Sequence, residues 1–362
     1  MFEIIFLAVI TVYFYSLIFF TVGLAEKYLK IPDDELPSAS IIVAARNEEK
    51  SIVLCLKSLS ELNYPEGKLE IIIIDDNSQD KTPELIKEFI SGKSNFVFLQ
   101  TGKLKTSLTG KSAALAEGIS KSRGEIILTT DADCTVGKNW AKNIVSYYRK
   151  DVGVVCGFTN YRTKNIFSSV QTIDLTFLLS VASGMMNSRL PVSAIGNNMS
   201  FRKSAYIETG GLEKLKPSVT EDYALIKAFS SIKKYKMLFP ADAGTVVTSI
   251  ACEDFKSLYH QKKRWAVGGM DSSFIGLFVM SAGWITSIMI LISLLSLCSS
   301  YFLVLFKFAI DFLFLKYAVS KLKQKMNLLS FILFEIYFIS YISVLPFVLI
   351  ISRKVKWKER EY

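Results

Sequence analysis

An acidic motif, Asp131-Ala132-Asp133, has residue types and a spacing that could bind a divalent cation. It directly follows the apolar run 125–130, and if that run is a strand that continues through the motif, both carboxylates point the same way. With diphosphate oxygens, they could complete the octahedral oxygen shell that Mg²⁺ or Mn²⁺ prefers. The alternative for this motif taken alone is a turn with a helix cap.

Two other motifs could contact a nucleotide. Asp75 and Asp76 begin the polar run 75–78, where a carboxylate could hydrogen-bond a base or a ribose; the alternative is a turn. Gly110-Lys111-Ser112 is not a Walker A motif, because Lys105 stands where that motif requires a glycine. Lys111 could still meet a phosphate at the start of a helix, although a solvated lysine explains it equally well.

Two motifs nearer the C-terminus could act on an acceptor and on a leaving group. In Glu221-Asp222, Asp222 could be a general base that takes a proton from an acceptor hydroxyl, or the two acids could simply begin a helix. In the segment 261–265, Arg264 could hold a departing diphosphate and Trp265 could supply a stacking face. The alternative is a basic and aromatic helix at a membrane surface.

The spacing of apolar residues places these motifs at the ends of strands. Four short runs are mostly apolar and β-branched, namely 40–45, 69–74, 96–99 and 125–130. Helical spacing begins at Ile52 and again near Thr82, where Pro83 suits a first turn. Apolar strands that alternate with helices predict a parallel sheet covered on both faces. The motifs then fall at the carboxyl ends of strands, where open α/β sheets bind ligands.

Three long apolar segments predict that the chain enters a membrane. Residues 4–23 and 328–351 each suffice for one crossing, which takes about 20 residues. The segment 272–306, with the stretch to 319, predicts a hairpin of two spans that turns near Ser299 and Ser300. Lys307 and Asp311 could pair within it at i,i+4 spacing. We expect an anchor rather than a cleaved signal peptide at the N-terminus, because Glu3 stands where a signal carries basic residues.

The charge distribution favours a membrane surface as the partner. The net charge of +10 concentrates beside the apolar segments, which favours the cytosolic face and anionic headgroups over nucleic acid. The sequence does not determine on which side of the membrane the basic tail lies. A single span over 328–351 would place the tail and the equally basic loop before that span on opposite sides. Five cysteines without a CxxC pair argue against a disulfide or zinc framework. The expected parts are an anchor at 1–25, a soluble α/β domain at 36–270, spans at 272–297, 299–319 and 328–351, and a tail at 352–362.

The motifs in this order resemble the family 2 glycosyltransferases. The resemblance covers residues 37–270 and rests on Ala44-Ala45-Arg46-Asn47-Glu48, Asp75-Asp76, Lys111, Asp131-Ala132-Asp133, Gly196-Asn197-Asn198, Glu221-Asp222 and the segment from Gln261 to Trp265. It implies a GT-A fold, which is a Rossmann-like, mostly parallel α/β sheet, joined here to transmembrane helices. One departure is that Ala44, Ala45 and Arg46 replace the Pro and Tyr that the family often has there, which weakens the expected nucleoside contact.

The resemblance also implies roles. The expected nucleotide-sugar contacts are Ala45, Asn47, Glu48, Asp75, Asp76, Lys111 and Asp131. The metal, Mg²⁺ or Mn²⁺, would be bound by Asp133 with Asp131 assisting. Asp222 would be the base, Arg264 would stabilise the departing nucleoside diphosphate, and Trp265 would line the acceptor entrance, with Gln261 opening the same motif.

We therefore expect an integral protein of a bacterial cell membrane whose catalytic domain is cytosolic. It would move a hexose-type sugar with inversion from a nucleotide-sugar, taken as a UDP-sugar, to a lipid or lipid-linked acceptor. This acceptor is preferred because about four spans do not provide the tunnel of many helices that a polymer needs. The alternatives are a processive or oligomeric polysaccharide synthase subunit, with a saccharide acceptor, and a non-enzymatic nucleotide-sugar-binding scaffold. The sequence predicts no oligomeric state.

Overall fold

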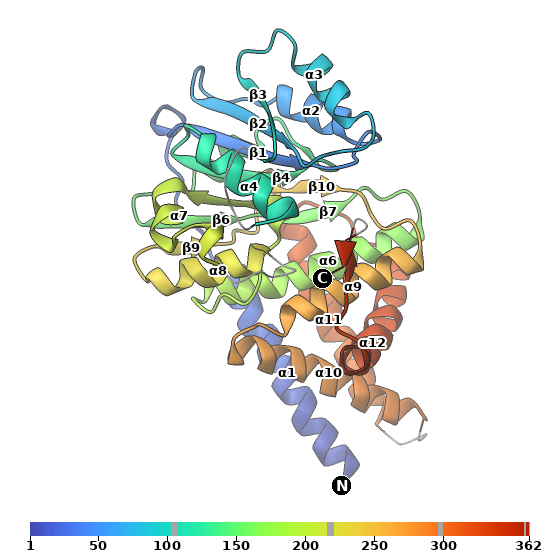
Figure 1. The fold of residues 1–362 in the computed structure, drawn as a ribbon. Coiled ribbons are helices and arrows are strands. Elements are labelled where there is room, and N and C mark those ends of the chain that lie inside the picture. Colours follow the sequence, from blue (N-terminus) through green and yellow to red (C-terminus); the bar gives the residue numbers. More distant parts are fainter. Residues whose placement is uncertain (103–107, 216–220, 296–299, 358–359, 362) are drawn as a thin grey trace. The chain divides into compact units, whose positions relative to one another are not determined.

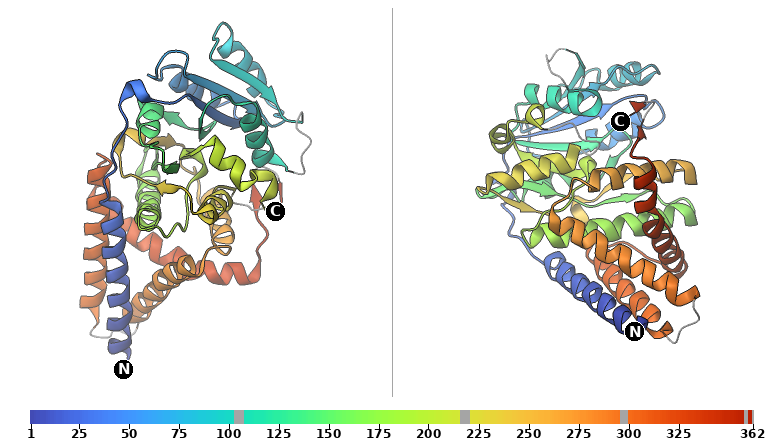
Figure 2. Two further views of the ribbon diagram at one scale, coloured as in Figure 1. Left: turned by 90° about the vertical axis from the view of Figure 1, so that its left-hand side faces the viewer. Right: turned by 60° about the horizontal axis from the view of Figure 1, so that its bottom comes forward.

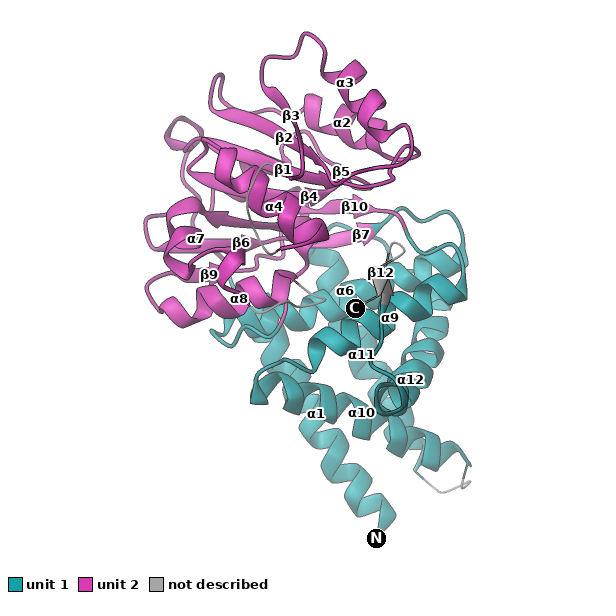
Figure 3. Cartoon of the chain, in the orientation of Figure 1, with its two compact units in different colours: residues 1–26, 161–192, 251–362 teal, residues 27–160, 193–250 magenta. Residues whose placement is uncertain are grey.

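The computed structural model describes residues 1–102, 108–215, 221–295, 300–357 and 360–361. The chain divides into two compact units, which Figure 3 colours separately. The first, here called the sheet unit, comprises residues 27–160 and 193–250. The second, here called the helical unit, comprises residues 1–26, 161–192 and 251–362.

The sheet unit is built on a seven-stranded sheet with the order β3-β2-β1-β4-β8-β6-β9 (Figure 1). The strands are β1 Ala39–Ala45, β2 Leu69–Asp75, β3 Phe96–Gln100, β4 Ile126–Asp131, β6 Val152–Cys156, β8 Met199–Arg202 and β9 Lys236–Leu238. The four predicted strands pair in parallel, and β8 runs antiparallel to both β4 and β6. The expected α/β fold with a mostly parallel sheet is therefore confirmed.

The register of the parallel strands brings their carboxyl ends to one edge. Ala45 pairs with Asp75, Ala44 pairs with Asp131, and Asp75 pairs with Gln100. Strand β1 lies between β2 and β4, so the chain order reverses direction at β1. A reversal of this kind opens a crevice at the strand ends, which is the usual ligand position in open α/β sheets.

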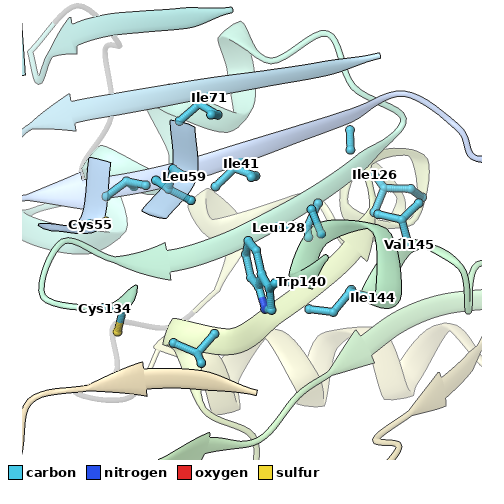
Figure 4. Close-up of a cluster of buried hydrophobic side chains, with 14 of the residues drawn as sticks. Ile41, Cys55, Leu59, Ile71, Ile126, Leu128, Cys134, Trp140, Ile144 and Val145 are labelled. Carbon is cyan, nitrogen blue, oxygen red and sulfur yellow. The ribbon is translucent and has the colours of Figure 1, made fainter. Parts of the chain in front are cut away.

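Helices cover both faces of this sheet because its strands are apolar on both. They are α2 Ile52–Ser60, α3 Thr82–Ile90, α4 Gly110–Lys121, α5 Trp140–Val145, α7 Lys203–Thr209 and α8 Glu221–Ile232. Leu59 of α2 and Ile144 of α5 share a buried cluster with Ile41 and Ile71, as Figure 4 shows. On the other face, a Cβ added at Gly118 of α4 would lie 2.6 Å from an Ile74 methyl group, so helix and sheet are in close contact. Side chains alternate along a strand, which explains how one strand supplies both layers.

The helical unit contains six helices among its described residues (Figures 1 and 2). They are α1 Phe2–Leu24, α6 Ile166–Asn187, α9 Phe255–Gly269, α10 Phe274–Leu295, α11 Tyr301–Lys321 and α12 Leu328–Ile351. Helix α6 contacts α1, α11 and α12. Within the described ranges, α1, α6, α10 and α12 are long and apolar enough to cross a membrane. The sequence did not predict α6, whose most apolar stretch is 67% buried against 28% in each of the other three.

Helix α11 falls where a span was expected but carries Lys307, Asp311 and Lys316, and it is not among those four. The predicted pair of Lys307 and Asp311 is confirmed, with 2.9 Å between Nζ and Oδ2. Lys307 also pairs with Glu335 of α12, and the Tyr13 hydroxyl of α1 donates to Asp311 Oδ1 at 2.9 Å. These contacts compensate charges that are 0–1% exposed. Of the expected turn, Ser299 lies outside the described residues and Ser300 precedes α11.

Candidate active site

The loops after β1 and β2 are joined by hydrogen bonds. The backbone N–H of Asn47 donates to Ser78 Oγ at 3.0 Å, and Asn47 Oδ1 accepts from the Gln79 N–H at 2.8 Å. The Glu48 N–H donates to Thr82 Oγ1 at 2.7 Å. Asn47 has a φ of 52°, a left-handed conformation that asparagine tolerates better than most residues. Asn47 and Glu48, the residues expected to contact the nucleoside, are therefore held on two loops that hydrogen bonds join, here called the double loop.

Asp75 and Asp76 are both buried at the strand end. Asp75 is 1% exposed, and its carboxylate faces the Ser78 N–H at 3.4 Å. The Asp76 N–H donates to the Ala45 carbonyl at 2.8 Å, and its carboxylate lies 3.7 Å from the Arg46 guanidinium. The structure thus brings Ala45, Asp75 and Asp76 together, although both carboxylates are almost fully buried.

Lys111 lies in the first turn of α4 and forms two ion pairs. Its Nζ is 2.6 Å from Asp131 Oδ1 and 3.2 Å from Glu221 Oε1. Burial disfavours its charge, but the carboxylates of Asp131, Glu221 and Asp222 outweigh that effect and hold the pKa of Lys111 well above its ordinary value. The simple solvated lysine is therefore wrong, since this ammonium group is bound to acids from two distant parts of the chain.

The chain turns at the Asp131-Ala132-Asp133 motif. Strand β4 ends at Asp131, and the Cys134 N–H donates back to the Asp131 carbonyl at 3.0 Å. The strand does not continue through the motif, because this hydrogen bond closes a turn, which was the alternative considered for the motif taken alone. Asp133 accepts from Cys134 Sγ at 3.3 Å and from Ser249 Oγ at 3.4 Å, whereas Asp131 binds Lys111.

The side chains around this turn suit a cation that takes most of its ligands from substrate phosphates and water. The described residues contain no group of three or more His, Cys, Asp or Glu side chains suited to a metal. Burial and the neighbouring Asp133 and Asp131 raise the pKa of the Cys134 thiol, and hard cations such as Mg²⁺ prefer oxygen to sulfur ligands. Two carboxylates remain, and Mg²⁺ is commonly held by one or two carboxylates together with substrate phosphates and water.

Asp222 begins α8 and is fixed by a backbone donor. The Gly196 N–H donates to Asp222 Oδ2 at 2.8 Å. The Gly196 carbonyl accepts in turn from Thr129 Oγ1 of β4 at 2.7 Å. A Cβ added at Gly196 would lie 3.4 Å from Asp222 Oδ2 and 3.6 Å from Lys111 Nζ. Glu221, Asp222, Lys111 and Asp131 therefore form one charged cluster at the end of β4.

Asn198 fixes the turn that carries Gly196. This side chain is fully buried; its Oδ1 accepts from Trp140 Nε1 at 3.1 Å and its Nδ2 donates to the Phe158 and Thr245 carbonyls at 2.6 and 2.9 Å. Sequence reasoning noticed the run Gly196-Asn197-Asn198 but gave it no role. Glu221 was named in its motif without a role of its own. Thr129 was missed, and no local pattern distinguishes it from any other strand residue.

The remaining predicted residues belong to the helical unit, on α9. Gln261 Oε1 lies 3.5 Å from the Tyr161 hydroxyl, which donates to it. Lys262 places its ammonium group 4.4 Å from the centre of the Trp265 ring. Arg264 and Trp265 are both half-buried. The four described cysteines, Cys55, Cys134, Cys156 and Cys252, are free thiols.

Sequence comparisons identify relatives of the chain. The family model for glycosyl transferase family 2 matches residues 40–210, and that for glycosyl transferase family group 2 matches residues 126–351. The beta-monoglucosyldiacylglycerol synthase of Nostoc sp. is 31% identical over 258 residues, covering 67% of this chain and 51% of that protein. The poly-beta-1,6-N-acetyl-D-glucosamine synthase of Staphylococcus aureus is 29% identical over 266 residues, covering 72% and 61%. The chain thus spans between half and two thirds of the length of these relatives.

A solved structure has the same fold. The mannosyltransferase PcManGT from Pyrobaculum calidifontis, in complex with GDP-Man and Mn²⁺, matches with a TM-score of 0.59 at 16% identity. The match covers 89% of this chain and 99% of that one, which confirms the expected GT-A fold. Because the family group 2 model covers more than half of the sequence, the chain belongs to the family 2 glycosyltransferases.

Proposed function

We propose that this protein transfers a hexose-type sugar from a UDP-sugar to a lipid or lipid-linked acceptor, with inversion at the anomeric carbon. The observation that carries the proposal is the position of Lys111, 2.6 Å from Asp131 and 3.2 Å from Glu221, beside Asp222. This cluster combines a cation suited to a diphosphate, a carboxylate suited to a metal and a carboxylate suited to an acceptor hydroxyl.

On the acceptor side, Asp222 takes the proton of the acceptor hydroxyl while the hydroxyl oxygen attacks the anomeric carbon. The new C–O bond forms as the bond to the diphosphate breaks, so one displacement inverts the configuration. The Gly196 N–H fixes the rotation of the Asp222 carboxylate through the bond to Oδ2. A positioned base of this kind contributes about 10²–10⁴-fold to the rate.

On the leaving side, positive charge stabilises the departing nucleoside diphosphate. Lys111 keeps its charge through the ordinary pH range, because three neighbouring carboxylates raise its pKa, and it can exchange Asp131 for a phosphate oxygen. A divalent cation held by Asp133 and Asp131 would supply further charge neutralisation when bound. Arg264 is proposed from its motif alone to bind the same diphosphate, and Trp265 and Gln261 to face the acceptor.

The double loop after β1 and β2 supports a nucleoside position. Its hydrogen bonds hold Asn47 and Glu48 above the buried end of β2. We propose that the base and ribose lie against Ala45, Glu48 and the carboxylate of Asp76. Asp75, which is 1% exposed, then supports the loop through the Ser78 N–H instead of touching the ligand.

Two observations support a lipid acceptor at a membrane. Among the residues that the structure describes, four helices are apolar enough to cross a bilayer, and the Nostoc relative is named for a glycosylated diacylglycerol. The Staphylococcus aureus relative, named as a polysaccharide synthase, favours the second candidate, a saccharide acceptor extended by many sugars. In both cases we propose that the helical unit lies in the cell membrane and that the sheet unit is cytosolic.

Product analysis with the full-length protein in lipid nanodiscs tests the proposal. The protein would be incubated with radiolabelled UDP-sugars, diacylglycerol and Mn²⁺ or Mg²⁺, and the products partitioned between organic and aqueous phases. One sugar on an organic-phase lipid is the expected result. A long water-soluble chain would support the polysaccharide candidate instead, and no turnover with any donor would support a nucleotide-sugar-binding scaffold.

A further inference from the structure

A buried aspartate lies in the middle of α6, a helix apolar enough to cross a membrane. Asp174 is 1% exposed and forms an ion pair with Lys262 of α9. The Tyr341 hydroxyl of α12 donates to Asp174 Oδ1 at 3.0 Å. Three helices of the helical unit therefore meet at one carboxylate, which the proposed reaction does not use.

The partner of Asp174 is part of the segment that carries Trp265. Lys262 stands three residues before Trp265, so both side chains lie on the same side of α9. The Lys262 ammonium group is 4.4 Å from the centre of the Trp265 ring and 5.2 Å from that of Tyr341. A cation at this distance is attracted to the face of an aromatic ring. A continuous series of contacts thus leads from Asp174 through Lys262 to the Trp265 ring.

Stability alone is a weak explanation for this arrangement. A buried ion pair is costly to desolvate, and replacing one by apolar residues often leaves stability unchanged or improved. The helical unit also contains a second buried pair, Lys307 with Asp311, at a place that holds no motif residue. This pair provides a control for the loss of a buried carboxylate from the same unit, although Lys307 would keep Glu335 as a partner.

We propose that Asp174 is a positioning residue that fixes the ring of Trp265 through Lys262, so that Trp265 presents its stacking face to the acceptor. The part that concerns the acceptor rests on the proposed function. The orientation of Trp265 is a separate property, which can be measured without any turnover.

Fluorescence of Trp265 tests the positioning step. The chain has four tryptophans, so the signal of Trp265 is the difference between each protein and its Trp265→Phe counterpart. In nanodiscs, we expect Asp174→Asn to shift this difference spectrum and to increase its quenching by acrylamide at least about twofold, because a ring released by Lys262 samples more orientations. Asp311→Asn should leave it unchanged. An unaltered Trp265 signal in folded Asp174→Asn, or an equal change in Asp311→Asn, would overturn the proposal.

Kinetics test the consequence for the acceptor. We expect Asp174→Asn to raise the acceptor KM by about tenfold or more with the donor KM unchanged, since small misplacements of a positioning group cost up to about 10²-fold. If the unpaired Lys262 prevents folding, the double variant Asp174→Asn with Lys262→Met removes both charges and should show the same two changes. A donor KM that rises as much as the acceptor KM would contradict the proposal. If wild-type protein turns over no donor, the proposed function fails while the fluorescence result still decides whether Asp174 positions Trp265.

Discussion

The backbone N–H of Gly196 donates to Oδ2 of Asp222 across 2.8 Å, although 26 residues separate them. Gly196 is held from the other side by the Thr129 hydroxyl, and its turn is locked by the buried Asn198 amide. The proposed base is therefore oriented by the sheet itself and not only by the helix that it begins.

Gly196→Ala should impair catalysis without unfolding the protein. The added Cβ would lie 3.3 Å from Asp222 Cβ, which is tight enough to push that side chain aside. We expect kcat to fall by about tenfold or more, given the cost of small misplacements. Steady-state rates of UDP release would measure it. Gly137→Ala is the control, because no atom lies within 4 Å of its Cβ, and equal rates for the two variants would contradict this reading.

Asp222→Asn should remove the general base while keeping the Gly196 hydrogen bond through the amide oxygen. We expect kcat to fall by about 10²–10⁴-fold, with the donor KM near that of wild type because Asp222 acts on the acceptor. Asp151→Asn removes a carboxylate paired with Lys236 at 2.7 Å on the surface and should keep full activity. Undiminished turnover by Asp222→Asn would remove Asp222 from the catalytic assignment.

Asp133→Asn should raise the metal concentration needed for activity. The amide is a weaker ligand than the carboxylate, and even the loss of a residue that only supports a metal ligand costs about 10–100-fold in affinity. Titration of Mn²⁺ in the activity assay, and calorimetric binding of Mn²⁺ with UDP present, would measure this. Ser249→Ala removes only the 3.4 Å contact to Asp133 and should have a smaller effect. If both variants need the wild-type concentration of metal, Asp133 is not a ligand.

The sequence predicted the strands of the sheet that can be recognised from a short run of consecutive residues. Strands β1, β2, β3 and β4 are compact apolar runs followed by polar residues, so strand ends and motifs could be placed together. Strand β8 could not be placed, because its antiparallel pairing with β4 joins residues about 70 positions apart. The Lys111 contacts with Asp131 and Glu221 were unpredictable for the same reason.

The helical unit shows a second limit. Helix α6 was overlooked because Gln171, Asp174 and several hydroxyl residues interrupt its apolar pattern. These groups nevertheless have partners, since Gln171 Nε2 donates to the Cys252 carbonyl, Asp174 pairs with Lys262, and hydroxyls such as that of Thr176 donate to carbonyls one turn earlier. The pair of Lys307 and Asp311 was predicted, since i,i+4 spacing is visible in the sequence. The further partners of this pair, Tyr13 and Glu335, lie on other helices and were not predicted. The roles of all named site residues remain predictions.

Asp242→Asn should destabilise the sheet unit at neutral pH but not in acid. Burial raises the pKa of Asp242, yet Lys30 at 2.7 Å, the Gly244 N–H and the Tyr147 hydroxyl outweigh this and lower it. A carboxyl whose pKa is lower in the folded protein than in the unfolded chain stabilises the fold at pH values above its unfolded pKa. This stabilisation is lost as the pH falls through the folded pKa. We expect a loss of about 1 kcal/mol at pH 7, allowing for partial exposure. Urea unfolding at several pH values would measure it, and a pH-independent difference would contradict it.

Gly23→Ala should separate α1 from α6. The added Cβ would lie 2.1 Å from the Gly184 carbonyl oxygen, and backbone atoms cannot move aside as a flexible side chain would. A hydrogen bond also joins the two helices here, since Asn187 Nδ2 donates to the Gly23 carbonyl at 3.0 Å. Small residues allow such close approach between apolar helices, and overpacking costs about 1–3 kcal/mol. We therefore expect a lower Tm in detergent micelles.

The control for that change is Gly283→Ala in α10, where no atom lies within 4 Å of the added Cβ. Alanine favours a helix over glycine by about 1 kcal/mol, so this variant should melt at or above the wild-type temperature. Thermal unfolding followed by circular dichroism would compare the three proteins. The close contact of Gly23 with Gly184 predicts opposite shifts for two chemically identical substitutions, and equal Tm values for both would show that α1 does not pack against α6 in this way.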